Sequence, residues 1–348
     1  SMTARIGILG FAHGHVNAYC KQWRQMPSME ARVVAGWDHD ADRLAQAVEA
    51  HQIEAADDAS ALLRRDDIDA VVVAAETAHH ADLVEQAAAA GKAIVMQKPL
   101  ALTLEQADRM VAAVERAGVP FTMAWQMRVD AQNLKMKRLI EDGSIGRVFM
   151  VRRRHGLSTH LWDEPFTRSW HVQPELNRGM WADDAAHPID FLLWLLGKPA
   201  SVMAEIDTLH NPSVPDDNGI AIYRYADGTM AEVSCSFTCP AGENTTEIVG
   251  ERGTIVQNFG DAPSCNAPRA DDAVGLKWYT TDDEQWHISD VPSPASHSER
   301  IAALAEPLAS FLNGRRAPVA DVCEGRASLH MTLAAYDSAR TGRRITFG

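Results

Sequence analysis

Lys98, in the segment Gln97-Lys98-Pro99, is the residue whose type and position most clearly indicate a role in chemistry. It follows an apolar run at 93–96 that is typical of a buried strand. Ligands of doubly wound sheets bind beyond the carboxyl ends of the parallel strands, and a proline keeps the residue before it out of the α region. We therefore predict that Lys98 extends from a strand end into a binding site, with an ordinary surface lysine as the alternative.

The segment 183–187 places two aspartates and a histidine at the start of an apolar stretch that includes Phe191 and Trp194. This stretch predicts a buried helix. Side chains four residues apart share one face of an α-helix, so we expect Asp183 and His187 to lie close together. A buried carboxylate and imidazole are costly unless they are paired or functional. A structural Asp–His hydrogen bond and a general base both satisfy this pattern.

A glycine-containing turn follows the first apolar run, 4–10. A dinucleotide-binding fold needs G-x-G-x-x-G there, so that the backbone can approach a pyrophosphate at a helix N-terminus. Only the first glycine is in register, because alanine and histidine replace the other two and a glycine comes one residue early. An ordinary strand–helix turn stays open as the alternative. The candidate cofactor-binding residues of this turn are Gly10, Phe11, Ala12, His13, Gly14 and His15.

Asp38 ends a second apolar run, 31–37, at a distance from the turn that suits a ribose-binding carboxylate. Such a carboxylate accepts from both ribose hydroxyls and repels a 2′-phosphate, so Asp38 favours NAD over NADP. A solvated strand end is the alternative. Arg43, about one helical turn further on, complicates the choice between the two cofactors.

Strands and helices that alternate over the first 124 residues position these side chains. Strand-like runs lie at 4–10, 31–37, 69–75, 93–96 and 119–124, and helical ones at 40–51, 80–90 and 103–118. Thr103 is the expected N-cap of the last helix with Gln106 as its partner, and Gly91 and Gly118 are expected C-terminal glycines. The alternation predicts a parallel sheet with helices on both faces.

The pattern changes near residue 150, where strand-like segments follow one another at 146–156, 200–210, 218–226, 229–238, 245–250 and 253–259. Turn signals at Asp227-Gly228 and Arg252-Gly253 separate them, which predicts an antiparallel sheet. Residues 261–299 are expected to be the least regular part, before helices that start at Glu299 and at 324. We predict an α/β fold: a doubly wound parallel sheet over 1–125, then an α+β domain with an open, mainly antiparallel sheet over 126–348.

Composition limits the classes of partner. The 348 residues include 33 Lys+Arg and 47 Asp+Glu, and the net charge of −14 disfavours nucleic acid and anionic membrane surfaces. No apolar run reaches the ~18 to 20 residues of a membrane span, and we expect no signal peptide. The five scattered cysteines lack metal-binding spacing and suggest a reducing, cytoplasmic location. Histidines and aspartates are possible ligands, but no tight multi-ligand spacing occurs, so we predict no metal.

Taken together, the chain resembles the Gfo/Idh/MocA oxidoreductases, the group that includes glucose–fructose oxidoreductase and inositol dehydrogenase. The resemblance covers nearly the whole chain and rests on the glycine turn, the segments 89–100 and 338–343, Asp183-x-x-x-His187 and Asp227-Gly228. It implies an NAD-binding Rossmann domain and a second domain that carries the substrate pocket and forms a homodimer or homotetramer through its sheet. Two motifs depart from the family: Glu-Lys-Pro is Gln97-Lys98-Pro99, and Gly-Gly-Gly is Asn177-Arg178-Gly179.

The resemblance also implies residue roles for the oxidation of a secondary alcohol. Lys98 would stabilise charge on the reacting oxygen, His187 would take the hydroxyl proton, and Asp183 would orient the imidazole or hold a neighbouring hydroxyl. The cofactor site would extend to Asp38, Arg43, Thr77, His80, Gln97 and Lys98. Candidate substrate residues, for which ordinary loop and core positions are equally open, are Arg128, His155, Trp162, Trp170, His171 and Asp184.

Three functions compete on these grounds. The leading one is an NAD-dependent dehydrogenase of a sugar, cyclitol or related polyol. The second is a glycosidase, lyase or isomerase that retains NAD and regenerates it in each cycle, which the departure at 177–179 keeps open. The third is a cofactor-binding regulator without turnover, which the presence of Lys98, Asp183 and His187 together argues against.

Overall fold

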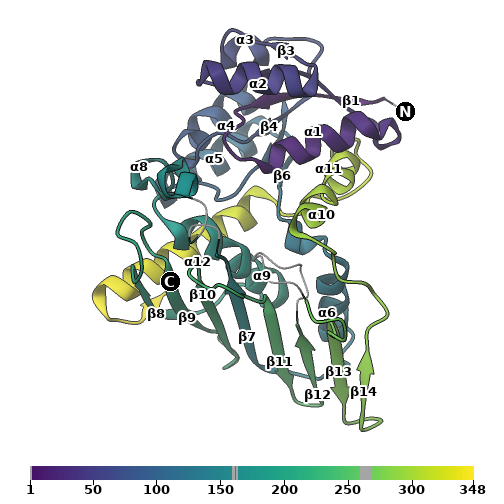
Figure 1. Ribbon diagram of the computed structural model, residues 1–348, viewed down its shortest axis with the longest axis vertical. Helices are drawn as coiled ribbons and strands as arrows, with labels where there is room; N and C mark the ends of the chain where they lie inside the picture. Colours follow the sequence, from purple (N-terminus) through teal and green to yellow (C-terminus); the bar gives the residue numbers. More distant parts are fainter. Residues whose placement is uncertain (1, 159–160, 162–163, 259–268) are drawn as a thin grey trace. The chain divides into compact units, whose positions relative to one another are not determined.

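The computed structural model describes residues 2–158, 161, 164–258 and 269–348. The chain forms two compact units (Figure 1). The first unit consists of residues 1–126, 175–177 and 301–329, and the second of residues 127–174, 178–300 and 330–348.

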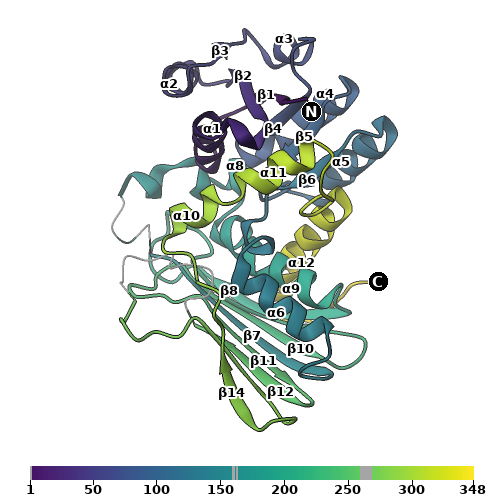
Figure 2. The ribbon, with the colours of Figure 1, turned by 90° about the vertical axis from the view of Figure 1, so that its right-hand side faces the viewer.

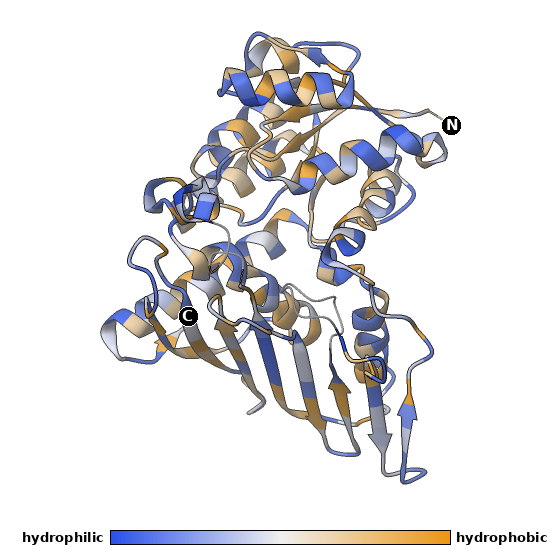
Figure 3. Ribbon diagram, in the orientation of Figure 1, coloured by the Kyte–Doolittle hydropathy of each residue, from blue (hydrophilic) through white to orange (hydrophobic). Residues whose placement is uncertain are grey.

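The first unit contains a six-stranded sheet in the order β3-β2-β1-β4-β5-β6, in which every neighbouring pair is parallel. This is the strand order of a doubly wound dinucleotide-binding fold. The strands are mostly hydrophobic (Figure 3), as expected for a sheet buried on both faces. They are β1 (Ala4–Leu9), β2 (Ala31–Trp37), β3 (Glu54–Ala55), β4 (Ala70–Val73), β5 (Ala93–Met96) and β6 (Phe121–Met123).

Helices cover both faces of this sheet. Helices α1 and α2 contact each other on one side, and α4 and α5 on the other (Figure 2). The expected cap of α5 is present, since Thr103 Oγ1 accepts from the Gln106 N–H at 3.2 Å and Gly118 ends the helix with a φ of +66°. The parallel α/β fold is therefore confirmed. The helices are α1 (His15–Gln25), α2 (Ala41–His51), α3 (Ala59–Leu63), α4 (His80–Ala89), α5 (Leu104–Ala117) and α11 (Ala305–Leu312).

The turn after β1 needs a glycine at its first position. Gly10 has a φ of +90°, and a Cβ there would lie 2.6 Å from the Cα of Ala75. The Gly10 N–H donates to the Trp37 carbonyl at 2.8 Å, which ties the turn to the end of β2. By contrast, Gly14 has a φ of −59°, and a Cβ there would meet nothing within 4 Å.

The second unit contains a nine-stranded sheet in the order β14-β13-β12-β11-β7-β10-β9-β8-β15. Helices α6 (Ala131–Glu141) and α9 (Ala186–Leu196) lie on one face of it (Figure 2). The strands expected at 146–156, 200–210, 218–226, 229–238, 245–250 and 253–259 are present. They are β7 (Val148–Gly156), β8 (Ser201–Asp207), β9 (Asn218–Arg224), β10 (Met230–Ser236), β11 (Thr245–Gly250) and β12 (Gly253–Gln257).

The mainly antiparallel sheet expected from the sequence is confirmed, with two features that the pattern of strands did not indicate. The pair β7–β10 is parallel, because a long connection that includes α9 separates β7 from the later strands. The segment 261–299, expected to be the least regular part, contains β13 (Leu276–Thr280) and β14 (Gln285–Ile288), which extend the sheet in antiparallel fashion, while its residues 261–268 lie outside the described part of the chain. Both strands are short and mix polar with apolar residues, so no apolar run marks them in the sequence.

The remaining elements complete the two units. The expected terminal helix is α12 (Val322–Thr341), and a short strand β15 (Ile345–Thr346) pairs with β8. Among the described residues, no helix is both long and apolar enough to cross a bilayer. The shorter helices are α8 (Pro174–Asn177) and α10 (His297–Ala302).

We predict that Gly10→Ala lowers the free energy of unfolding by at least about 2 kcal/mol, because the new side chain meets the Ala75 backbone and the φ is unfavourable. The control Gly14→Ala changes it by less than about 1 kcal/mol. Urea unfolding followed by circular dichroism measures both. Equal stability of the two variants would contradict the tight packing of this turn.

Candidate functional site

The turn between β1 and α1 offers a helix N-terminus to an anion. Helix α1 begins at His15 and has no acidic residue in its first turn, so the positive end of its dipole is not neutralised. His13 is buried, its N–H donates to the Ala74 carbonyl at 2.9 Å, and its ring lies 4.4 Å from that of His15. The turn fits a dinucleotide pyrophosphate, because it leads into a helix N-terminus whose first turn contains no acidic side chain.

Asp38 directly follows β2 and its carboxylate is buried. Four donors reach its two oxygens: the N–H of Phe11 at 2.7 Å, the N–H of Asp40 at 2.8 Å, and Nε and Nη2 of Arg43 at 2.8 and 2.9 Å. Burial alone would raise the pKa of this carboxyl, but the bonds from Arg43 and the two backbone N–H groups hold it below 3.8. A carboxylate has about four acceptor positions, so Asp38 is saturated in this structure.

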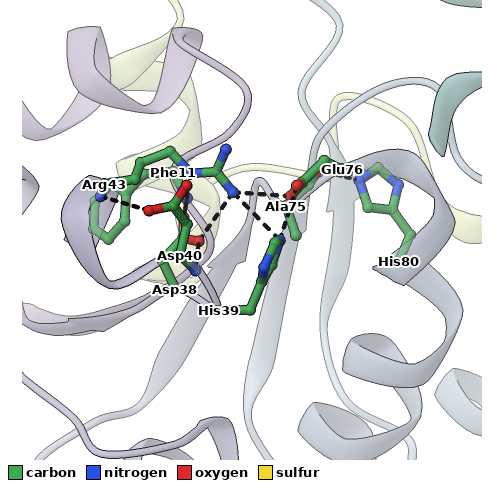
Figure 4. Close-up of polar contacts among 8 residues, drawn as sticks. All are labelled: Phe11, Asp38, His39, Asp40, Arg43, Ala75, Glu76 and His80. Carbon is green, nitrogen blue, oxygen red and sulfur yellow. Dashed lines mark hydrogen bonds and ion pairs between the residues drawn. The ribbon is translucent and has the colours of Figure 1, made fainter. Parts of the chain in front are cut away.

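Arg43 connects Asp38 to a second buried carboxylate, Glu76, which the sequence reasoning missed (Figure 4). Arg43 Nη2 lies 3.1 Å from Glu76 Oε1, and His39 Nε2 lies 2.8 Å from Glu76 Oε2. Burial raises the pKa of Glu76, but its backbone hydrogen bond, Arg43 and His39 outweigh burial and keep the pKa below 4.5. The signal in the sequence was an acidic residue directly after the apolar run at 69–75.

His39, Glu76 and His79 offer ligand atoms that all lie within 4.8 Å of one another, a grouping that can hold a metal ion. The guanidinium of Arg43 already serves as the cation there. Its Nη2 lies 3.4 Å from His39 Nε2 as well as beside Glu76.

Other expected cofactor residues of the first unit are buried and bound to their neighbours. Thr77 Oγ1 donates to Asn177 Oδ1 at 2.5 Å, and Gln97 Nε2 donates to the Tyr19 hydroxyl at 2.9 Å. His80 Nδ1 lies 3.0 Å from the Leu100 carbonyl and its Nε2 lies 2.9 Å from the Ala75 carbonyl. Burial lowers the pKa of His80 against the opposing effect of these carbonyls.

His80 thereby ties the loop after β4 to the segment that follows Lys98. Lys98 itself comes two residues after β5 ends and is 3% exposed, and its peptide bond to Pro99 is cis. The expectation that Lys98 stands at the carboxyl end of a parallel strand is confirmed. An ordinary surface position is not what the structure shows.

In the second unit, the segment of the two aspartates differs from the expected regular α-helix. Residues Trp181–Ala185 form a π-helix, and α9 starts only at Ala186. The four-residue spacing therefore does not place Asp183 and His187 as it would on an α-helix. Single π-helical turns inside helices occur frequently at functional sites.

The two aspartates of this π-helix contact different histidines, Asp183 one of them and Asp184 two. Asp183 Oδ1 lies 3.1 Å from His171 Nδ1. Asp184 Oδ2 lies 2.7 Å from His155 Nε2, and its Oδ1 lies 3.8 Å from His187 Nε2. Asp184 thus stands between two imidazoles, both of them nearly completely buried.

The other candidate substrate residues have different surroundings. Trp170 stacks on His171 with ring centroids 3.9 Å apart. Arg128 is buried, and its guanidinium forms a two-pronged ion pair with buried Asp190, at 2.8 and 2.9 Å. Trp162 lies outside the described residues.

Sequence reasoning also missed the support of the π-helix. The Tyr336 hydroxyl accepts from the Ala182 N–H at 3.0 Å and donates to Asp216 Oδ2 at 2.8 Å. Arg178 lies over the Tyr336 ring at 4.4 Å and has φ +71° and ψ −60°, a strained conformation for a residue other than glycine. The departure at 177–179 therefore places an arginine in the strained turn before the two aspartates.

Comparison with known proteins agrees with this architecture. Residues 4–125 match the model of the oxidoreductase family with an NAD-binding Rossmann fold, and residues 133–256 match the GFO/IDH/MocA C-terminal domain. The chain is 32% identical over 265 residues to D-apiose dehydrogenase of Paraburkholderia graminis, covering 72% of this chain and 66% of that protein. It is 30% identical over 262 residues to inositol 2-dehydrogenase of Klebsiella pneumoniae, covering 72% and 73% of the two chains.

Among solved structures, the WlbA dehydrogenase of Bordetella pertussis in complex with NADH and UDP-GlcNAcA superposes with a TM-score of 0.81. It is 26% identical and covers 99% of each chain. The chain belongs to the Gfo/Idh/MocA oxidoreductase family. It is therefore an enzyme of an oxidoreductase family with an NAD-binding Rossmann domain.

We predict that Asp190→Ala lowers the free energy of unfolding by about 3–5 kcal/mol, because the charge of Arg128 would remain buried without the carboxylate that now pairs with it. Chemical denaturation measures this change. The double variant Arg128→Met/Asp190→Leu removes both charges and should recover most of the loss. A single variant as stable as the wild type would instead point to an Arg128 that serves a ligand.

Proposed function

We propose that this enzyme oxidises a secondary hydroxyl of a sugar, cyclitol or related polyol by hydride transfer to NAD. The observation that carries the proposal is the buried His187 imidazole beside the carboxylate of Asp184, which is the arrangement of a general base and the group that orients it. Relatives named as apiose and inositol dehydrogenases support the substrate class. We assign cofactor binding to residues 1–125, and substrate binding and oligomerisation to 126–348.

His187 takes the hydroxyl proton as the carbon–hydrogen bond breaks. A nearby carboxylate favours the protonated imidazole, so Asp184 stabilises the charge that His187 acquires. Lys98 donates to the reacting oxygen and stabilises its developing negative charge. Bound NAD supplies the hydride-accepting chemistry.

Asp183 contacts His171 in the structure, and we assign this pair to holding a substrate hydroxyl next to the stacked Trp170. His155 takes the second oxygen of Asp184 and so keeps that carboxylate turned toward His187.

The buried carboxylates Asp38 and Glu76 support NAD rather than NADP as the cofactor. Cys20 and Cys235 are buried free thiols, which support a cytoplasmic location.

We predict that His187→Ala and Lys98→Ala each lower kcat by about 10²- to 10⁴-fold, because each removes a group that acts on the reacting oxygen or its proton. Nicotinamide reduction with a panel of sugars, cyclitols and sugar acids measures the rate. Lys198→Ala, at an exposed lysine, is the control and should retain full activity.

Two results would contradict this assignment. Full turnover in both variants would show that neither Lys98 nor His187 takes part in the reaction. Substrate consumption without accumulation of NADH, with solvent deuterium in the product, would instead identify a reaction that regenerates its NAD.

We also propose that the open face of the nine-stranded sheet joins copies of the chain. Met203, Ile220 and Ile222 are 42%, 50% and 45% exposed, and Met203 pairs directly with Ile222 across β8 and β9. Three large apolar side chains on neighbouring strands form a contiguous patch, which is typical of a protein interface.

We predict that the double variant Ile220→Lys/Ile222→Lys dissociates the oligomer, because two charged side chains would replace the apolar ones of the proposed interface. Sedimentation velocity gives the mass of each species. Ile288→Lys, at a 67% exposed position on β14, introduces the same side chain outside the patch and should leave the mass unchanged. An unchanged mass in the double variant would exclude this face.

A further inference from the structure

We propose that Glu76 is a positioning residue for cofactor selection: together with Asp38 it holds Arg43, so that the guanidinium is not available to a 2′-phosphate. The proposal rests on the use of NAD proposed above and deepens it. It assigns part of the discrimination against NADP to a residue that follows β4, whereas Asp38 follows β2.

The contacts show which nitrogens of Arg43 the two carboxylates hold. Its Nε donates to Asp38 Oδ2, and its Nη2 donates both to Asp38 Oδ1 and to Glu76 Oε1, at 2.8, 2.9 and 3.1 Å. The side chains of Asp38 and Glu76 are 0% and 5% exposed, whereas that of Arg43 is 26% exposed. Two buried anions therefore hold the inner side of a partly exposed cation (Figure 4).

Arginine at this position would otherwise favour NADP. In dinucleotide-binding folds the carboxylate after the second strand binds the ribose hydroxyls of NAD, whereas an arginine nearby accommodates the 2′-phosphate of NADP. This chain has both residues, five positions apart, so the residue types alone do not decide between the cofactors. Because Asp38 and Glu76 together carry two negative charges against one on Arg43, the cluster has a net charge of −1 and repels a phosphate.

Glu76 is the member of the cluster that can be changed without touching the turn. Asp38 accepts from the backbone of Phe11 in the glycine turn, so its replacement would disturb pyrophosphate binding as well. The hydrogen bonds of Glu76 with the side chains of Arg43 and His39 are made by its carboxylate oxygens. The substitution Glu76→Gln keeps the shape of the side chain and removes its charge, which leaves Arg43 with one anionic partner.

The test is the direct binding of NADH and NADPH to the full chain without substrate, followed by nicotinamide fluorescence. Glu76→Gln should tighten NADPH binding about tenfold, equivalent to about 1.4 kcal/mol, and change the Kd for NADH by less than about threefold. Adding Arg43→Ala to Glu76→Gln should remove the gain, because the freed guanidinium is the group that binds the phosphate.

Asp42→Asn is the matched control. Asp42 is exposed and adjacent to Arg43 in α2, so this variant loses the same unit of charge outside the cluster and should keep the wild-type ratio of the two Kd values. Equal ratios in Glu76→Gln and Asp42→Asn would overturn the proposal. A gain that persists in the double variant would overturn the role of Arg43. Wild-type protein that binds both cofactors equally would overturn the use of NAD itself, whereas wild-type preference for NADH with no shift in Glu76→Gln overturns only the role of Glu76.

Discussion

The carboxylate of Asp38 is the point on which the first unit depends. It is buried at the end of β2, where an ion without partners would cost several kcal/mol. Its four donors come from the glycine turn, from the residue that caps α2, and from Arg43 within α2. Satisfying this one charge therefore ties the glycine turn, the end of β2 and the start of α2 together.

The second unit solves a similar problem with two adjacent aspartates. Consecutive side chains of a helix point in different directions, so Asp183 and Asp184 reach different partners. Asp183 contacts His171, while Asp184 stands between His155 and His187. The π-helical turn accommodates both arrangements, and the Tyr336 hydroxyl holds its backbone at Ala182.

The sequence predicts what depends on local pattern. Apolar runs that alternate with helices were enough for the parallel sheet, and Thr103 and Gly118 marked the ends of α5 correctly. The π-helix was not predictable, because the one-face geometry of Asp183-x-x-x-His187 assumes the α-helical period. Glu76 was missed for a related reason. Its importance comes from Arg43, which is 33 positions away in the sequence and becomes its neighbour only when β2 and β4 flank β1 in the sheet.

The positions of the acidic residues explain how a chain with a net charge of −14 can bind a dinucleotide. A dinucleotide is an anion, so an acidic protein can bind it only where its own acids are absent or useful. The first turn of α1 contains no acidic residue, which leaves the helix terminus to attract a pyrophosphate. Two buried acids lie instead at the ends of β2 and β4, where one cation is shared between them. In the cofactor selection proposed here, these two acids distinguish two cofactors by a single phosphate, because the one cation between them does not balance their charge.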